Sequence, residues 1–162
     1  QDGFVSTYAD IVYTKEIAKA VAESPHGVTL GCDTDWRRRY EGRSQHPETD
    51  AEKLVADGER VVKLSRRIAS EEASGEFIGV MKVSRERVPE LLSAFDKASA
   101  QHGGKVYREG RTFEKAYLID FLADRLESGD DLHRANTHGG YMEIDTLEDR
   151  SLAEKWWTER AR

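Results

Sequence analysis

Two aspartates, Asp10 and Asp145, lie near opposite ends of the chain, each beside a short apolar run. Asp10 lies in the string Tyr8–Tyr13 and Asp145 in the string Tyr141–Asp149. Each string predicts a strand that delivers one carboxylate at its end, and open α/β sheets bind ligands beyond the carboxyl ends of their strands. Carboxylates that converge in this way hold hard cations such as Mg²⁺, usually together with substrate phosphates. The pair therefore predicts a Mg²⁺ site and phosphate chemistry.

The segment from Asp33 to Arg43 combines acidic, aromatic and basic side chains within eleven consecutive positions. Arginines bind a phosphate or phosphonate through two parallel hydrogen bonds, while carboxylates and an aromatic face suit an amine or hydroxyl group. We therefore expect Asp33, Asp35, Trp36 and Arg43 to contact a small substrate. The alternative is a solvated loop whose arginines pair with neighbouring acids.

Three further charged residues are candidates for the same chemistry. Lys53 precedes an apolar run, and a lysine that faced the metal would act as a catalytic point charge on the transition state. The alternative for Lys53 is a strand-edge charge that discourages aggregation. Lys63 and Glu76 are candidates for contacts to the acceptor. Gly79 either lets substrate approach the backbone closely or marks a strand bulge.

The elements that must position these residues alternate along the chain. Strands are predicted over residues 5–12, 28–32, 77–83 and 141–144, with a hairpin of 53–56 and 60–64 around Asp57-Gly58. Helices are predicted after Thr14 and over residues 85–100, 113–126 and 147–157. The alternation predicts one α/β domain over residues 1–162, with a mostly parallel sheet flanked by helices.

The start of the last helix offers another use for Asp145. Either Asp145-x-x-Glu148 or Thr146-x-x-Asp149 fits the capping-box pattern, in which two side chains satisfy each other's backbone N–H groups. A capping role and a metal role are both open for Asp145, through different oxygens.

Composition narrows the class of protein. The 162 residues are 35% charged and 38% hydrophobic with a net charge of −6, which argues against a general nucleic-acid binder. No apolar run approaches the roughly 18 residues that span a bilayer. The single cysteine, Cys32, is expected in the core, and a reducing cytoplasm is the expected location. The five histidines lack zinc-ligand spacing, and His46 and the others receive no role.

Five strings, in this order, resemble the nucleotidyltransferase family, nearest its cytidylyltransferases for small phosphonates and phosphocholine-type compounds. The strings are Ala9–Tyr13; Asp33–Trp36 with Tyr40, Gly42 and Arg43; Ala51–Leu54; Gly75–Gly79; and Gly140–Asp149. The resemblance implies a Rossmann-like nucleotidyltransferase fold with Asp10 and Asp145 as its two metal-binding aspartates. It also implies a Mg²⁺-dependent reaction in which an acceptor oxygen attacks the α-phosphorus of CTP and pyrophosphate leaves.

One feature of that family has no counterpart in this sequence. Its members open with a strand and a glycine-rich basic loop that cradles the nucleotide, and no such loop occurs here. We therefore expect the C-terminal part of a nucleotidyltransferase domain, completed by an N-terminal segment or chain, with apolar residues exposed along 5–12 or 28–32 where that segment packs. The alternatives are a sugar-1-phosphate nucleotidyltransferase and a non-catalytic interaction or regulatory module.

Overall fold

The computed structural model describes residues 3–160, except the side chain of Arg160. The strands are β1 (Phe4–Thr7), β2 (Ile11–Tyr13), β3 (Val28–Asp33), β4 (Lys53–Asp57), β5 (Arg60–Leu64), β6 (Gly75–Val83), β7 (Val106–Arg108), β8 (Arg111–Thr112), β9 (His133–Thr137) and β10 (Tyr141–Glu143). The helices are α1 (Lys15–Ala22), α2 (Val88–His102), α3 (Leu118–Glu127) and α4 (Leu147–Arg160), and short 3₁₀ turns cover 36–39, 48–50 and 113–115. All four predicted helices are present, although α3 starts later than predicted because a 3₁₀ turn precedes it.

The main sheet is mixed, so the prediction of a mostly parallel sheet is wrong. Its strand order is β1-β6-β3-β9-β5-β4, and β4 also pairs with β6, so five of the six strands form a closed cycle of pairings. Among the described strands, β3 and β9 form the one parallel pair. The reason is that β4 and β5 are joined by a tight hairpin, and β6 runs back along β3. The polar strand β9 was missed because it lacks the apolar alternation that marks a strand.

The first predicted strand is interrupted, and the interruption creates part of the site. Residues 8–10 separate β1 from β2, and the backbone N–H of Tyr8 donates to the carbonyl oxygen of Gly79 at 3.0 Å. Gly79 has a φ of +72°, and a Cβ at this position would overlap the ring of Tyr8. Glycine is therefore required here so that the Tyr8 ring can lie against β6.

The edge strand β1 exposes apolar side chains, as the sequence predicted for this segment. Phe4 is 44% exposed and Val5 is 42% exposed, because β1 pairs with β6 on one side and lies at the end of the strand order. The other candidate segment, β3, has neighbours on both sides and is buried throughout.

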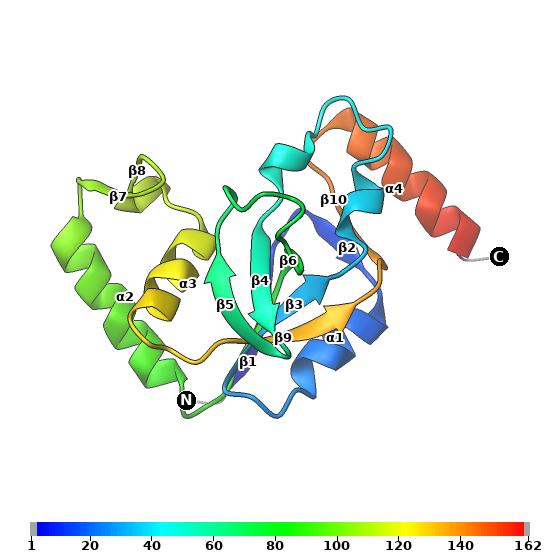
Figure 1. The fold of residues 1–162 in the computed structure, drawn as a ribbon. Helices are drawn as coiled ribbons and strands as arrows, with labels where there is room; N and C mark the ends of the chain where they lie inside the picture. Colours follow the sequence, from blue (N-terminus) through cyan, green and yellow to red (C-terminus); the bar gives the residue numbers. More distant parts are fainter. Residues whose placement is uncertain (1–2, 161–162) are drawn as a thin grey trace.

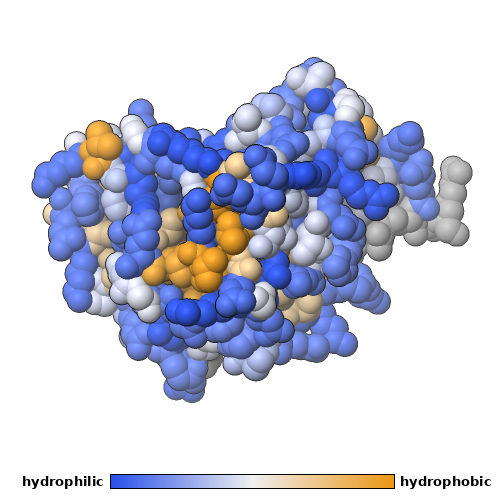
Figure 2. Space-filling model, in the orientation of Figure 1, coloured by the Kyte–Doolittle hydropathy of each residue, from blue (hydrophilic) through white to orange (hydrophobic). Residues whose placement is uncertain are grey.

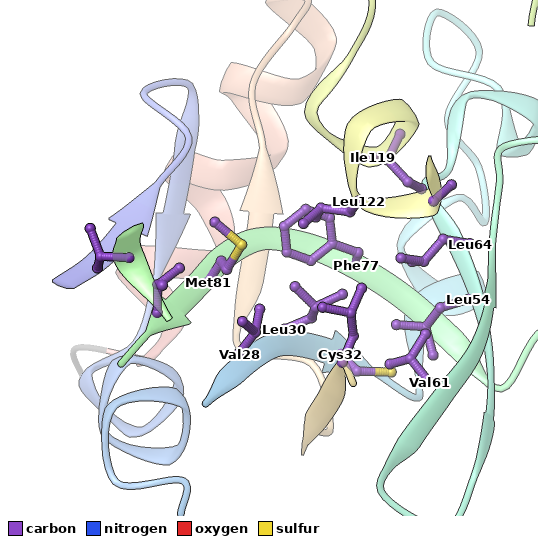
Figure 3. Packing of buried hydrophobic residues seen from close by; sticks show 14 residues of the cluster. Val28, Leu30, Cys32, Leu54, Val61, Leu64, Phe77, Met81, Ile119 and Leu122 are labelled. Atoms are coloured by element: carbon purple, nitrogen blue, oxygen red, sulfur yellow. The ribbon is translucent and has the colours of Figure 1, made fainter. Parts of the chain in front are cut away.

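The core lies between the sheet and α3 (Figure 3). Phe77 of β6 packs against Leu122 of α3, and Leu30 of β3 belongs to the same cluster. Cys32 is fully buried in this cluster, as predicted. Burial of each such side chain contributes on the order of 1.5–3 kcal/mol, so this cluster fixes the position of β4 and β6.

Helices surround the sheet on several sides (Figure 1). α1 packs on β3, β6 and β9, while α2 and α3 lie on the opposite side of the molecule from α4. The hairpin turn lies between the paired residues Asp57 and Arg60, one position later than predicted, with Gly58 at a φ of +58°. Figure 2 shows a mostly hydrophilic face with hydrophobic surface gathered near its centre, over the region where β5 lies in Figure 1. Within residues 3–160, no helix has the length and apolar character needed to cross a lipid bilayer.

Candidate functional site

A two-stranded ribbon of β2 and β10 brings Asp10 and Asp145 to the same place. Asp10 directly precedes β2, and Asp145 follows β10 after one residue. Because the two strands pair antiparallel, with Glu143 opposite Ile11, the start of one lies beside the end of the other. The backbone N–H of Ile144 donates to the carbonyl oxygen of Asp10 at 2.8 Å. Both aspartates line one cavity of about 670 Å³.

This cavity is strongly acidic, and we call it the carboxylate pocket. Its six acids are Asp10, Asp50, Glu52, Glu76, Glu143 and Asp145. Its bases are His46 and Arg66, and its walls include the rings of Tyr8, Phe77, Tyr117 and Tyr141. Concentrated negative charge of this kind requires counter-charges, either from the protein or from bound cations.

Three of the six acids accept hydrogen bonds from other side chains of the protein. The Tyr8 hydroxyl donates to Glu52 at 2.9 Å, and Arg66 donates to Asp50 at 2.7 Å. Glu76 accepts a hydrogen bond of 2.7 Å from the Tyr40 hydroxyl and forms an ion pair with Arg39. The remaining acids lie at the ribbon end of the pocket, and they are Asp10, Glu143 and Asp145.

At the ribbon end, one ligand atom each from His46, Glu143 and Asp145 lies within 4.8 Å of the others. Burial raises the pKa of the Glu143 carboxyl, and the negative charges of Asp145 and Asp10 raise it further. A bound cation would remove this mutual repulsion. Carboxylate oxygens are the ligands that Mg²⁺ prefers, whereas an imidazole suits a transition metal, so the acids fit Mg²⁺ and His46 fits a supporting position.

Glu143 and His46 were not predicted from the sequence. Glu143 could have been found, because residues i and i+2 of an extended strand point to the same side and Asp145 is two positions later. His46 carried no such signal. It lies in an irregular segment, is only 4% exposed, and is 3.3 Å from Asp149 and 3.6 Å from Glu143.

Thr146 and Asp149 form the capping box at the start of α4. The Thr146 hydroxyl accepts the backbone N–H of Asp149 at 3.1 Å, and Asp149 accepts that of Thr146 at 3.0 Å. This is the second of the two capping boxes that the sequence allowed. Asp145 precedes the cap, so its carboxylate remains available to the pocket.

Arg43, a predicted substrate contact, is instead buried against that cap. Its side chain is 1% exposed, and its Nε donates to Asp149 at 2.9 Å. Burial opposes the charge of Asp149, but hydrogen bonds from Arg43 and Thr146 hold the pKa of this carboxyl below its usual range. Arg43 does not line the carboxylate pocket. The pair joins the long loop after β3 to α4 and so supports the wall that carries His46.

Two of the predicted contacts in the 33–36 segment, Asp33 and Trp36, are buried as well, while Asp35 is partly exposed. Asp33 is fully buried at the end of β3 and accepts backbone N–H groups of Asp35 and Gly139, each at 2.9 Å. Trp36 is 3% exposed and packs with Tyr40. Neither Asp33, Asp35 nor Trp36 lines the carboxylate pocket.

The remaining predicted residues, Glu76, Lys53 and Lys63, do not all line the same pocket. Glu76 lines the carboxylate pocket, whereas Lys53 lines a different cavity. Lys63 lies on β5 with its ammonium 3.8 Å from Glu72, and both side chains are more than half exposed. Lys53, predicted to face a metal, therefore does not line the pocket that contains Asp10 and Asp145, whereas its neighbour Glu52 does.

Glu52 is a further site residue that the sequence prediction left without a role. Burial is the main cause that raises its pKa to about 7, and the nearby charge of Glu143 adds to this effect. The hydrogen bond from Tyr8 acts in the opposite direction. Glu52 can therefore accept a proton or a cationic group near neutral pH.

The protein is therefore an α/β domain with a mixed sheet and an acidic, tyrosine-lined pocket. No protein-family model matches the sequence. The chain is, however, 24% identical over 150 residues to the CTP:phosphoglutamine cytidylyltransferase of Campylobacter jejuni subsp. jejuni, a match that covers 92% of this chain and 57% of that protein.

Solved structures of nucleotidyltransferases show the same fold. The inositol-1-phosphate CTP transferase from T. maritima matches with a TM-score of 0.60 and 17% identity, over 92% of this chain and 51% of that chain. The CTP:phosphocholine cytidylyltransferase from Streptococcus pneumoniae matches with a TM-score of 0.59 and 16% identity, over 94% and 57% of the two chains. The resemblance to the cytidylyltransferase branch of the nucleotidyltransferases is therefore confirmed. This chain spans about half the length of these proteins.

Proposed function

We propose that this chain forms the metal- and acceptor-binding part of a Mg²⁺-dependent cytidylyltransferase. The complete enzyme would transfer CMP from CTP to a small phosphonate or phosphocholine-like acceptor and release pyrophosphate. The observation that carries the proposal is the meeting of Asp10, Glu143 and Asp145 at one end of an acidic pocket. The similarity to cytidylyltransferases supports it.

In this proposal Asp10 and Asp145 hold the Mg²⁺, with Glu143 beside them. The bound ion would neutralise the phosphates that must approach one another and polarise the α-phosphate. His46 lies 3.9 Å from Asp145 and 3.6 Å from Glu143 and would keep both carboxylates oriented. Residues that contact metal-binding carboxylates without binding the metal themselves commonly fix the geometry of those carboxylates.

Other residues of the same pocket would bind the acceptor's head group. Glu52 and Tyr8 line it as a hydrogen-bonded pair, and Tyr117 adds an aromatic face. A carboxylate next to tyrosine rings suits an ammonium or a hydroxyl group. The pocket therefore favours an acceptor with a small polar or cationic end over one with a second phosphate at that end.

The nucleotide would be held by a glycine-rich, basic segment that the 162 residues do not contain. Such loops bind triphosphates through backbone N–H groups, which carboxylates cannot replace. A second candidate is a non-catalytic interaction or regulatory module. A cytoplasmic location is proposed on the basis of the single buried cysteine.

The test has two parts. First, isothermal titration of the 162-residue chain with Mg²⁺ should show binding that is lost in Asp145→Asn and kept in Asp35→Asn, a matched change outside the pocket. Second, the chain joined to the nucleotide-binding segment of a cytidylyltransferase should release pyrophosphate from CTP with 2-aminoethylphosphonate, 2-hydroxyethylphosphonate or phosphocholine.

Turnover with a hexose 1-phosphate alone would refute the small-acceptor proposal. Mg²⁺ binding without turnover for any acceptor or nucleotide would favour the non-catalytic module. Equal Mg²⁺ affinity in the wild type and Asp145→Asn would remove the basis of the metal assignment.

A further inference from the structure

A second cavity, of about 610 Å³, lies beside the carboxylate pocket and has the opposite charge. We call it the cationic pocket after the four basic side chains that line it: Lys53 of β4, Arg66 and Arg67 of the turn after β5, and Arg111 of β8. Glu48 and Glu109 line it too, so the cations exceed the acids by four to two. Arg66 lines both pockets.

Lys53 is the most unusual group in the cationic pocket. The residue is 3% exposed, yet among the described residues its ammonium makes one long hydrogen bond, 3.4 Å to the carbonyl oxygen of Ala51. The Trp36 ring lies 5.9 Å from the same nitrogen. An ammonium carries three donors, and burying one without partners is costly. Burial lowers the pKa of Lys53, which is consistent with a charge that lacks a close anion.

The arginines of this pocket also have donors to spare. Arg66 and Arg111 stack on the Tyr117 ring, with guanidinium carbons 4.9 Å and 4.2 Å from its centre. Nη1 of Arg111 is buried and makes no hydrogen bond within the described residues, although Glu109 lies 3.6 Å away. Arg67 is 71% exposed at the mouth.

Contacts to Glu109 hold together the chain segments that line the pocket. The Ser65 hydroxyl donates to the Glu109 carboxylate at 2.6 Å, and Arg67 donates to the Glu109 carbonyl oxygen at 3.1 Å. Glu109 has a φ of +49°, an uncommon conformation for a residue with a side chain. These bonds hold the β7–β8 hairpin against the arginine-containing turn, so the cations are gathered by the fold.

We propose that the cationic pocket binds a small oxyanion of the phosphate or carboxylate class, with Lys53 as its buried charge and Arg66, Arg67 and Arg111 as donors. Guanidinium groups bind such oxyanions through paired hydrogen bonds, and a lysine adds a compact charge. The oxyanion has two potential sources. It is either a free ion, or the anionic tail of an acceptor whose other end lies in the carboxylate pocket; the second source rests on the proposed function.

The decisive experiment is a titration of the 162-residue chain with orthophosphate, followed by backbone amide NMR shifts. We expect shifts in the 65–70 turn and weakening of phosphate binding by at least about tenfold in Lys53→Met, because one buried charge is removed. Lys63→Met, an exposed lysine of the neighbouring strand, should bind as the wild type does. Equal affinity in Lys53→Met and the wild type overturns the proposal.

A second variant guards against a misfolded Lys53→Met. Arg67→Gln changes an exposed residue and should weaken phosphate binding by about threefold. An unchanged affinity in Arg67→Gln, together with shifts outside the 65–70 turn, also overturns the proposal.

O-phosphoserine with Mg²⁺ distinguishes the two sources. If the oxyanion is the tail of an acceptor, O-phosphoserine binds at least about tenfold more tightly than orthophosphate and loses that advantage in Asp145→Asn. If it is a free ion, the two ligands bind equally and Asp145→Asn changes neither. The orthophosphate result stands on its own, so a failure of the proposed function leaves it interpretable.

Discussion

The carboxylate pocket and the cationic pocket share Arg66 and differ in charge, yet each contains a group that burial shifts towards its neutral form. Burial raises the pKa of Glu52 to about 7 and lowers the pKa of Lys53. These two residues are consecutive in sequence, and successive side chains of a strand point to opposite sides. One acid–base pair in the sequence therefore supplies two pockets of opposite charge.

A third buried site shows what a charge looks like when the protein itself provides its counter-charge. Arg43 and Asp149 are both buried, and they pair with each other. The pKa of Asp149 lies below its usual range, as expected for a carboxylate that is stabilised as an anion. Burial instead shifts the pKa values of Glu52 and Lys53 towards their neutral forms. The difference separates charges that hold the fold from charges that are available to a ligand.

The largest effect should come from breaking the internally paired charge. Asp149→Ala leaves Arg43 buried without its counter-charge and removes the cap of α4, so we expect a loss of about 3–5 kcal/mol in the free energy of unfolding. Asp145→Ala, four residues earlier, should change stability by less than about 0.5 kcal/mol because Asp145 does not cap the helix. Urea unfolding of both variants measures the two changes in the free energy of unfolding. Similar losses in the two variants would mean that Asp145 is structural.

The next effect concerns Glu52 and pH. Its pKa in the folded protein is about 7, above the ordinary 4.5, so the unfolded chain releases this proton more readily. The contribution of Glu52 to stability is therefore present below about pH 4.5 and is lost as pH rises to about 7. Glu52→Gln should remove this loss and gain up to about 3 kcal/mol relative to the wild type at pH 8, with little difference at pH 4.

Stability measured by denaturation between pH 4 and pH 8 tests this expectation. Glu23→Gln, an exposed acid on the surface of the molecule, is the matched control and should show no comparable change. A wild type and a Glu52→Gln variant with parallel pH profiles would contradict the shifted pKa.

The sequence predicted the meeting of Asp10 and Asp145 in one pocket, whereas it did not predict the burial of Asp33, Trp36 and Arg43. Asp10 and Asp145 each adjoin a short apolar run, which marks a strand end locally. The antiparallel β2–β10 ribbon that brings them together joins residues far apart in sequence, such as Tyr13 and Tyr141, and the resemblance to nucleotidyltransferases indicated that pairing where the local pattern could not. The 33–43 segment contains equally suggestive residues, but whether Arg43 meets a substrate or Asp149 depends on a contact across 106 positions. Periodicity along the chain carries no information about such a contact.

The prediction of mostly parallel strand pairing was wrong for a similar reason. Alternating strands and helices favour parallel pairing, but α1 connects β2 of the small ribbon to β3 of the main sheet. The helix therefore does not join two neighbouring strands of one sheet, as a βαβ unit would. Glu52 and Lys53 could have been assigned to opposite sides once β4 was predicted, because alternation is a local property.

A smaller effect should appear when Lys53 is replaced in the absence of an anion. The folded protein disfavours the buried ammonium, so its pKa is lowered and stability rises as pH increases through that pKa towards the ordinary 10.5. Lys53→Met should therefore be more stable than the wild type by about 1 kcal/mol at pH 7. Added orthophosphate should stabilise the wild type and not the variant, which reduces the difference. Thermal unfolding with and without phosphate measures both effects.

The smallest effect should come from Lys63→Met, which is the control for the comparison between the two pockets. Lys63 carries the same charge as Lys53 and lies on the neighbouring strand β5, but its side chain is 56% exposed and its ammonium is 3.8 Å from an exposed Glu72. Water screens such a pair, so its loss should change the free energy of unfolding by less than about 0.5 kcal/mol at any phosphate concentration. Because Lys63 lines neither pocket, pyrophosphate release by the completed enzyme should also stay unchanged. A clear loss of turnover in Lys63→Met with normal stability would restore Lys63 as the substrate contact that the sequence predicted. It would also show that the ligand extends beyond the two pockets, along β5.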